Sequence, residues 1–249
     1  MGTKRMIIPV FVPHKGCPND CIYCNQKSIS GQTEEMAGAR MREIVERNLS
    51  SFTGGRYIEI AFYGGSFTGI DKRKQLELLE TGQYYVNAGF VREMRLSTRP
   101  DYINEDILET LRKYNVRTIE IGVQSLDSEV LRISQRGHGI REVAEAARLI
   151  KDYGFRLGIQ TMIGLPGDTR EKDIITAQKV VEFNPEVVRI YPTLVIKNTK
   201  LESMYKNGEY SPLTVDEAVD ICAHLLEIYK ENGINVIRIG LQPTEEIRE

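Results

Sequence analysis

The chain has 249 residues, with 33 Lys+Arg against 35 Asp+Glu and a formal net charge of -2. Its 41% hydrophobic and 27% charged residues are ordinary for a globular protein and argue against a disordered tail. The near-neutral charge balance argues against a protein that binds nucleic acid mainly through bulk charge. No apolar run approaches the roughly 18 residues of a membrane helix. The start of the chain lacks a signal-peptide cleavage site, so we expect a cytoplasmic protein with no membrane partner.

Apolar, β-branched runs alternate with helical patterns along the chain. In chain order, strands are expected at residues 6–12, 57–63, 93–97, 117–123, 155–163, 187–195 and 235–239. Helices are expected between most of them, at residues 40–49, 71–86, 104–114, 141–153, 173–183 and 214–231. Thr214 and Glu217 form a capping box at the start of the last helix, and Gly154 and Gly233 are stop signals.

This alternation, with strands that look apolar on both faces, predicts a parallel sheet covered by helices. Six or seven strands allow either an open doubly wound sheet or a partial barrel. Most of the glycines and chemically able residues follow a strand, and such loops meet at the carboxyl ends of parallel strands. No linker or low-complexity stretch divides the chain, so we expect a single domain over residues 1–249.

Three of the four cysteines, Cys17, Cys21 and Cys24, lie in one turn-rich loop with C-x3-C-x2-C spacing. Such crowding indicates a metal or cluster site and not a disulfide framework. The fourth, Cys222, recurs at helical spacing with apolar neighbours such as Val219 and Leu226, which predicts a buried core thiol.

Three thiolates can hold three irons of a four-iron cluster, and the fourth iron is then open to a cofactor or substrate. The alternative is a structural zinc site, in which His14 would complete a Cys₃His set. A zinc-stabilised binding module without catalysis is therefore one of the functions to be tested.

The three cysteines, with aromatic Tyr23 just before the last, resemble the signature of the radical S-adenosylmethionine (radical SAM) superfamily. Gly64, Gly65 and Ser66 follow the second expected strand and resemble the family's glycine pair that meets the amino group of SAM. The resemblance implies a partial (β/α)6 TIM-like barrel, a [4Fe–4S] cluster on Cys17, Cys21 and Cys24, and SAM chelated by the fourth iron. It also implies reductive cleavage of SAM to a 5′-deoxyadenosyl radical that abstracts hydrogen from a substrate.

The segments around Gln124 and Arg136 resemble two groups of that superfamily, the oxygen-independent coproporphyrinogen oxidases and the radical SAM half of the Elongator catalytic subunit. The resemblance implies that Gln124 contacts SAM and that Arg136 pairs with its carboxylate. Ser97 and Gln160 occupy further cofactor-binding positions by resemblance. Both depart from the family pattern, since Ser97 stands where both groups usually carry Glu and Gln160 where the porphyrinogen enzymes usually carry an acid.

Residues 189–196, followed by Thr199 and Leu201, make the chain most similar to the Elongator group. Elongator catalytic subunits continue into an acetyltransferase-type domain, whereas this sequence ends at Glu249, so we expect either a shorter paralogue or a fragment.

The resemblance implies modification of a tRNA wobble uridine, with tRNA as a partner and a ferredoxin or flavodoxin as electron donor. Basic residues flank the cysteine loop and are candidates for phosphate contacts: Lys4, Arg5, Lys15 and Lys27. The alternative substrate is a small, porphyrin-like molecule.

Overall fold

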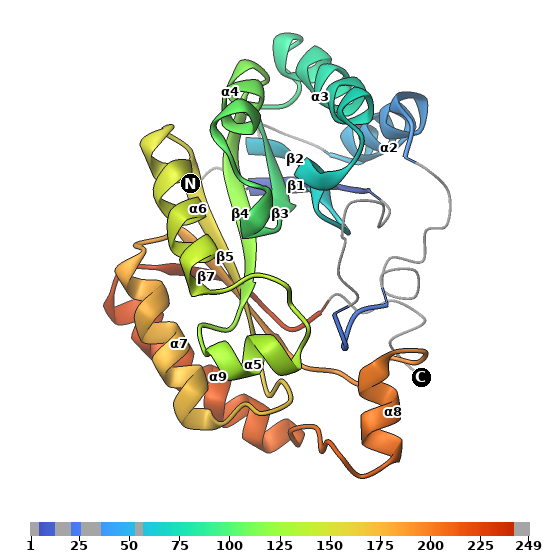
Figure 1. Cartoon of the computed structure of the whole chain (residues 1–249). Helices are drawn as coiled ribbons and strands as arrows, with labels where there is room; N and C mark the ends of the chain where they lie inside the picture. Colours follow the sequence, from blue (N-terminus) through green and yellow to red (C-terminus); the bar gives the residue numbers. More distant parts are fainter. Residues whose placement is uncertain (1–4, 13–20, 26–35, 53–56, 242–249) are drawn as a thin grey trace.

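Seven parallel strands form a single curled sheet in the computed structural model, which describes residues 5–12, 21–25, 36–52 and 57–241 (Figure 1). The strands lie side by side in chain order, and each pairs in parallel with the next. Their bounds are β1 Arg5–Phe11, β2 Tyr57–Tyr63, β3 Glu93–Thr98, β4 Val116–Gln124, β5 Arg156–Ile163, β6 Val187–Pro192 and β7 Asn235–Ile239. This is a TIM-like partial barrel, as predicted, with the sheet curled into a half-barrel.

Helices connect successive strands, and the longer ones cover the outer face of the sheet (Figure 1). They are α2 Gly38–Ser51, α3 Lys72–Asn87, α4 Glu105–Lys113, α5 Ser128–Ile133, α6 Ile140–Asp152, α7 Arg170–Glu182, α8 Lys200–Lys206 and α9 Val215–Glu231, with short 3₁₀ turns η1 Phe67–Gly69 and η2 Pro100–Tyr102. Of the described residues, no helix combines the length and the apolar character needed to cross a bilayer.

The predicted end signals act as expected. Thr214 and Glu217 form the capping box of α9, and Gly154 and Gly233 take left-handed φ values of 79° and 70° directly after α6 and α9. The helices α5 and α8 were not predicted. They span only 6 and 7 residues, too few for an apolar period of 3.6 to repeat visibly.

The prediction that the strands are apolar on both faces is wrong. In β2, Ile60 and Phe62 are fully buried in the main hydrophobic core beneath the helices. Their neighbour Glu59 points to the other face, where it pairs with Arg95 of β3. The inner face of the half-barrel is therefore not uniformly apolar, because it carries buried charged groups such as Glu59, Arg95 and Glu120.

Helix α9 confirms one prediction about the core and corrects another. Cys222 is buried, as expected, together with Leu225 and Tyr229. Val219 and Leu226, which share its apolar spacing, are 62% and 40% exposed. The helix packs on α7 and β7 through one face, so the second apolar stripe faces outward.

Candidate cofactor site

Residues 21–25 carry two of the three predicted thiols, Cys21 and Cys24, and Cys17 lies outside the described residues. The Ile22 N–H donates to the Ser134 carbonyl over 3.2 Å, and the Ile22 carbonyl accepts from the Leu201 N–H over 2.8 Å. The Cys24 N–H donates to the Cys21 carbonyl over 2.9 Å, which closes a turn between the two thiols. The segment is thus fixed between the end of α5 and the start of α8.

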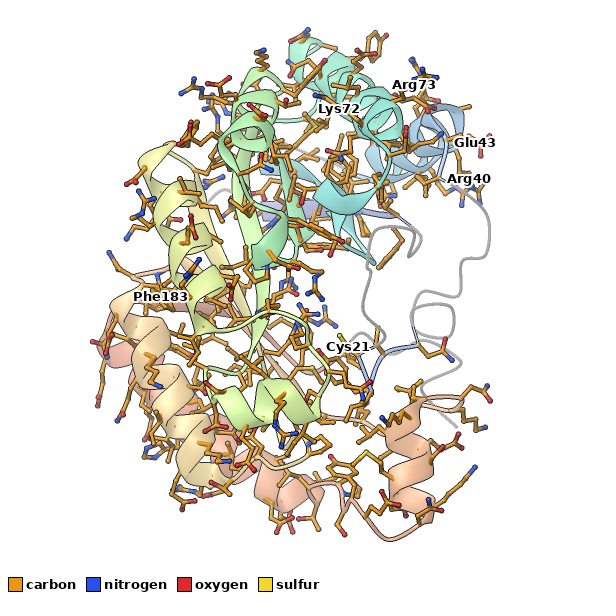
Figure 2. The ribbon with its side chains drawn as sticks, in the orientation of Figure 1. Cys21, Arg40, Glu43, Lys72, Arg73 and Phe183 are labelled. Carbon is orange, nitrogen blue, oxygen red and sulfur yellow. The ribbon has the colours of Figure 1, made fainter. Side chains whose placement is uncertain are left out.

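A small hydrophobic cluster, separate from the main core, holds this segment in place. Its buried members are Ile22, Leu201 and Tyr210, and Tyr23, Val195 and Met204 pack against them. The Tyr210 hydroxyl donates to the Gly164 carbonyl over 2.7 Å, which ties the cluster to the end of β5. In Figure 2, Cys21 lies between α8 and the strands.

Arg136 joins the cysteine segment to the inner face of the sheet. Its Nη1 donates to Cys21 Sγ over 3.5 Å, and its Nη2 donates to the Gly122 carbonyl over 2.6 Å. Arg136 and Cys21 are 7% and 6% exposed. Two segments that the sequence singled out for different reasons, the cysteines and the Gly122–Arg136 stretch, therefore meet.

The backbone of Arg136 is held by a residue that the sequence analysis missed. Arg99, which is only 1% exposed, donates from Nη2 to the Arg136 carbonyl over 2.8 Å. The same guanidinium makes a fork with Asp101, with bonds of 2.9 and 3.0 Å. An Arg and an Asp on either side of Pro100, directly after a strand, were the available signal.

Two glycines leave space that a side chain would fill. A Cβ on Gly122 would lie 2.7 Å from Arg136 Nη2, so the glycine makes room for the guanidinium. Gly64 has a φ of 104°, and a Cβ there would lie 2.8 Å from the Val12 carbonyl oxygen. Gly64 thus lets the backbone after β2 turn close to the end of β1, and Gly65 and the buried Ser66 follow it.

Gln124 ends β4 with a φ of 70°. Its Oε1 is buried and has no hydrogen-bond partner in the part of the chain that the structure describes. A buried amide oxygen requires a donor, so it fits a ligand that brings one. Together with the cysteine thiols and Arg136, Gln124 makes a donor set suited to an iron–sulfur cluster and a zwitterionic cofactor.

Gln160 of β5 and Ser97 of β3 lie on the inner face of the sheet, on either side of Glu120 in β4. Gln160 Nε2 donates to Glu120 Oε2 over 3.0 Å, so its amide is held by a strand neighbour. Ser97 is half-buried and stands opposite Glu120 in the β3–β4 register. The structure brings these two residues to Glu120, and brings Arg136 to Cys21.

Glu120 is the centre of a buried charge network that the sequence analysis did not predict. It pairs with Arg95 over 2.8 Å and with Arg189 Nε over 2.6 Å, and accepts from the Tyr63 hydroxyl over 3.2 Å. Burial acts to raise the pKa of Glu120, but the charges of Arg95 and Arg189 outweigh it and hold the pKa below its usual value. The available signal was a lone Glu or Arg inside an otherwise apolar strand, such as Glu59 in β2 and Arg189 in β6.

Three more buried groups have perturbed pKa values, and two of them lie near the thiols. Burial, aided by the charges of Arg136 and Arg99, lowers the pKa of His138 from 6.5 to about 4, so this ring is neutral at pH 7. Burial raises the pKa of the Tyr23 phenol above its usual value, although the Arg136 charge opposes the shift. Away from the thiols, burial and the charge of Asp168 raise the pKa of Asp173 to about 9.

Arg5, one of the basic candidates for a phosphate contact, lies away from the cysteine segment. Arg5 begins β1, at the opposite end of the strands from the cysteine segment, and pairs with Glu59 and Glu93. The other three basic candidates, Lys4, Lys15 and Lys27, lie outside the described residues, as does the zinc candidate His14. Within the described ranges, no three His, Cys, Asp or Glu side chains form a metal-binding group.

Two family models match the chain. The Radical SAM superfamily model matches residues 11–180, and the Radical_SAM C-terminal domain model matches residues 185–249. Several curated relatives are described as tRNA uridine(34) acetyltransferase. That of Methanocaldococcus jannaschii is 36% identical over 136 residues, covering 53% of this chain and 25% of that protein. That of Dehalococcoides mccartyi is 28% identical over 250 aligned positions, covering 84% of this chain and 54% of that protein.

Elongator complex protein 3 of Saccharomyces cerevisiae is 37% identical over 136 residues, 53% of this chain and 24% of that protein. The chain thus spans between a quarter and about half of these curated relatives. Among solved structures, Elp3 of Methanocaldococcus infernus has a TM-score of 0.75 at 22% identity, covering 96% of this chain and 60% of that one. Coproporphyrinogen III oxidase (HemN) from Escherichia coli has a TM-score of 0.63 at 18% identity, covering 93% and 54%.

Proposed function

Because this chain belongs to the radical SAM superfamily, we propose that Cys17, Cys21 and Cys24 bind a [4Fe–4S] cluster whose open iron takes SAM. The chain is a radical SAM enzyme, and its curated relatives include the tRNA uridine(34) acetyltransferases. When bound, the cluster and SAM supply reductive cleavage of the sulfonium and abstraction of a hydrogen atom from the substrate. The electron comes from a low-potential one-electron donor such as a ferredoxin or flavodoxin.

The observation that carries this proposal is the contact of Arg136 with Cys21 Sγ. It joins a thiol to a guanidinium, the planar fork that suits a carboxylate. Arg136 would bind the carboxylate of SAM, because it lies against Cys21 and Gly122, beside the iron that SAM would reach.

Several other residues would hold the rest of SAM. Gly64, Gly65 and Ser66 would present backbone groups to its amino group, since the turn at Gly64 leaves no room for a side chain. The unpaired Oε1 of Gln124 would accept a hydrogen bond from SAM. Tyr23, Ser97 and Gln160 would line the remaining walls. Gln160 Nε2 donates to Glu120, so the Gln160 Oε1 would be the atom that accepts a bond from SAM.

We propose tRNA as the substrate, with the wobble uridine as the modified base. Support comes from relatives at 35–37% identity, which are described as tRNA uridine(34) acetyltransferase or Elongator complex protein 3. A nucleobase must leave its stack to meet an enclosed active site. The polar inner face, with Tyr63, Gln160 and Arg189 half-buried or buried, suits a nucleoside better than an apolar ligand.

Anaerobic reconstitution with iron and sulfide tests the cluster. We expect about four irons per chain, and dithionite should then release 5′-deoxyadenosine from SAM. Cys21→Ala should lose both, whereas Cys222→Ala, a buried thiol in the main core, should keep both. Stoichiometric zinc with no iron uptake would favour the non-catalytic module and refute the proposal.

The substrate is tested separately with tRNA transcripts. Binding in a gel shift should weaken as salt rises, because phosphate contacts release counterions. A transcript with uridine at the wobble position should increase 5′-deoxyadenosine release, and a matched transcript with cytidine there should not. Equal release with both transcripts, or stimulation by a porphyrinogen in place of tRNA, would overturn the tRNA proposal.

A further inference from the structure

We propose that Arg136 has a second role, in which its bond to the Cys21 thiolate raises the reduction potential of the cluster. This inference rests on the proposed function, because it requires Cys21 to be a cluster ligand. It is distinct from binding the SAM carboxylate, since it concerns the protein before SAM is bound.

The contact between Arg136 and Cys21 is buried, where a charge affects its neighbours strongly. Arg136 Nη1 is 3.5 Å from Cys21 Sγ, and both residues are more than nine-tenths buried. Guanidinium stays protonated at all working pH values. In such a poorly hydrated setting its charge is screened less than it would be in water.

The protein itself sets the position of the guanidinium. Nη2 is held by the Gly122 carbonyl at 2.6 Å. The Arg136 carbonyl accepts from Arg99, and the Arg136 N–H donates to the Leu131 carbonyl over 3.0 Å. Because the backbone of Arg136 and its Nη2 are both held, Nη1 is placed beside Cys21 Sγ by the protein alone, without a ligand.

Reduction adds one electron to the cluster and forms or breaks no bond. Hydrogen bonds to the sulfurs and positive charge nearby favour the reduced state and so raise the potential. Arg136 supplies both to Cys21. Without it, a donor of fixed potential would reduce a smaller fraction of the clusters.

The test is a redox titration of the full chain, reconstituted without air and without SAM, and followed by visible and electron paramagnetic resonance spectra. Arg136→Gln should shift the midpoint potential to a more negative value, and Arg136→Lys should shift it less because Lys keeps the charge. Gly122→Ala keeps Arg136 but places a Cβ 2.7 Å from Nη2, so it should displace the guanidinium and also give a negative shift. Arg132→Gln removes an exposed cation from the same stretch of chain and should leave the potential unchanged.

The outcomes separate the two proposals. A wild-type chain that takes up no four-iron cluster refutes the proposed function. A wild-type chain with a normal cluster, whose potential is unchanged in Arg136→Gln or in Gly122→Ala, refutes the inference alone. If Arg136→Gln binds no cluster, Gly122→Ala and Arg136→Lys still decide the question, because both keep a cation at residue 136.

Discussion

Leu201→Ala should release the cysteine segment without unfolding the barrel. Leu201 is fully buried, yet it belongs to the small cluster with Ile22 and Tyr210 and not to the main core. The change removes three carbon groups, worth about 2.4 kcal/mol at ~0.8 kcal/mol each, and cavity formation brings the loss to about 3 kcal/mol. If the whole loss destabilises the docking of residues 21–25 on this cluster, the population in which the segment is undocked rises roughly 150-fold.

Amide hydrogen exchange in the metal-free chain measures this effect. The Ile22 N–H is bonded to the Ser134 carbonyl and the Leu201 N–H to the Ile22 carbonyl, so both amides report docking. Both should exchange about two orders of magnitude faster in Leu201→Ala, a factor set by the same ~3 kcal/mol.

Leu108→Ala on α4 is the matched control, because Leu108 is also fully buried but lies in the main core. It should lower the free energy of global unfolding and leave exchange at Ile22 unchanged. Equal acceleration at Ile22 in the two variants, or none in Leu201→Ala, would refute the view that the segment docks on a cluster of its own.

Three further predictions concern buried titratable groups. Glu120→Gln leaves Arg189 without its carboxylate partner and Arg95 with Glu59 alone, and urea denaturation should show a loss of about 3–5 kcal/mol. Because the folded pKa of His138 is lowered to about 4 from 6.5, its neutral form stabilises the fold above pH 6.5, and stability falls as pH drops from 6.5 towards 4. The loss should approach about 3 kcal/mol, and thermal melts of His138→Gln should show a flatter pH dependence over that range. Asp173 is neutral at pH 7 because its pKa is raised to about 9. Asp173→Asn should therefore lower the free energy of unfolding by less than about 1 kcal/mol in the same urea assay. A loss of stability as large as that of Glu120→Gln would mean that Asp173 is charged.

Strand order and helix placement were predictable because they depend on local patterns. The bounds of β2 and β7 match the apolar runs at residues 57–63 and 235–239. The partial barrel needed the resemblance as well, since alternation alone also allowed an open doubly wound sheet. Helices α5 and α8 escaped detection, although both hold the cysteine segment, because a helix of two turns leaves too short a pattern.

Site residues were predictable only where the residue type itself, such as a cysteine, indicates the chemistry. Cys21 and Arg136 could be named, but their contact joins residues far apart in the chain, which spacing cannot reveal. The contact of Arg99 with the Arg136 carbonyl could not be predicted, because its partner is a backbone group far along the chain, although Asp101 two residues on was a signal. The role of Glu120 was missed for another reason. A buried charge in a strand is favourable only when the neighbouring strands bring its counter-ions, and the register of strand pairing determines whether they do.

The anchoring of the cysteine segment also has a consequence for biosynthesis. The thiols leave the ribosome early, whereas the carbonyl of residue 134 and the N–H of residue 201 that secure them emerge much later. Since each strand pairs with the one made just before it, the sheet can assemble progressively during translation. Under the proposed function, metal delivery to the completed set of ligands would therefore have to wait until residue 201 has been synthesised, and an earlier encounter would meet thiols that are not yet anchored.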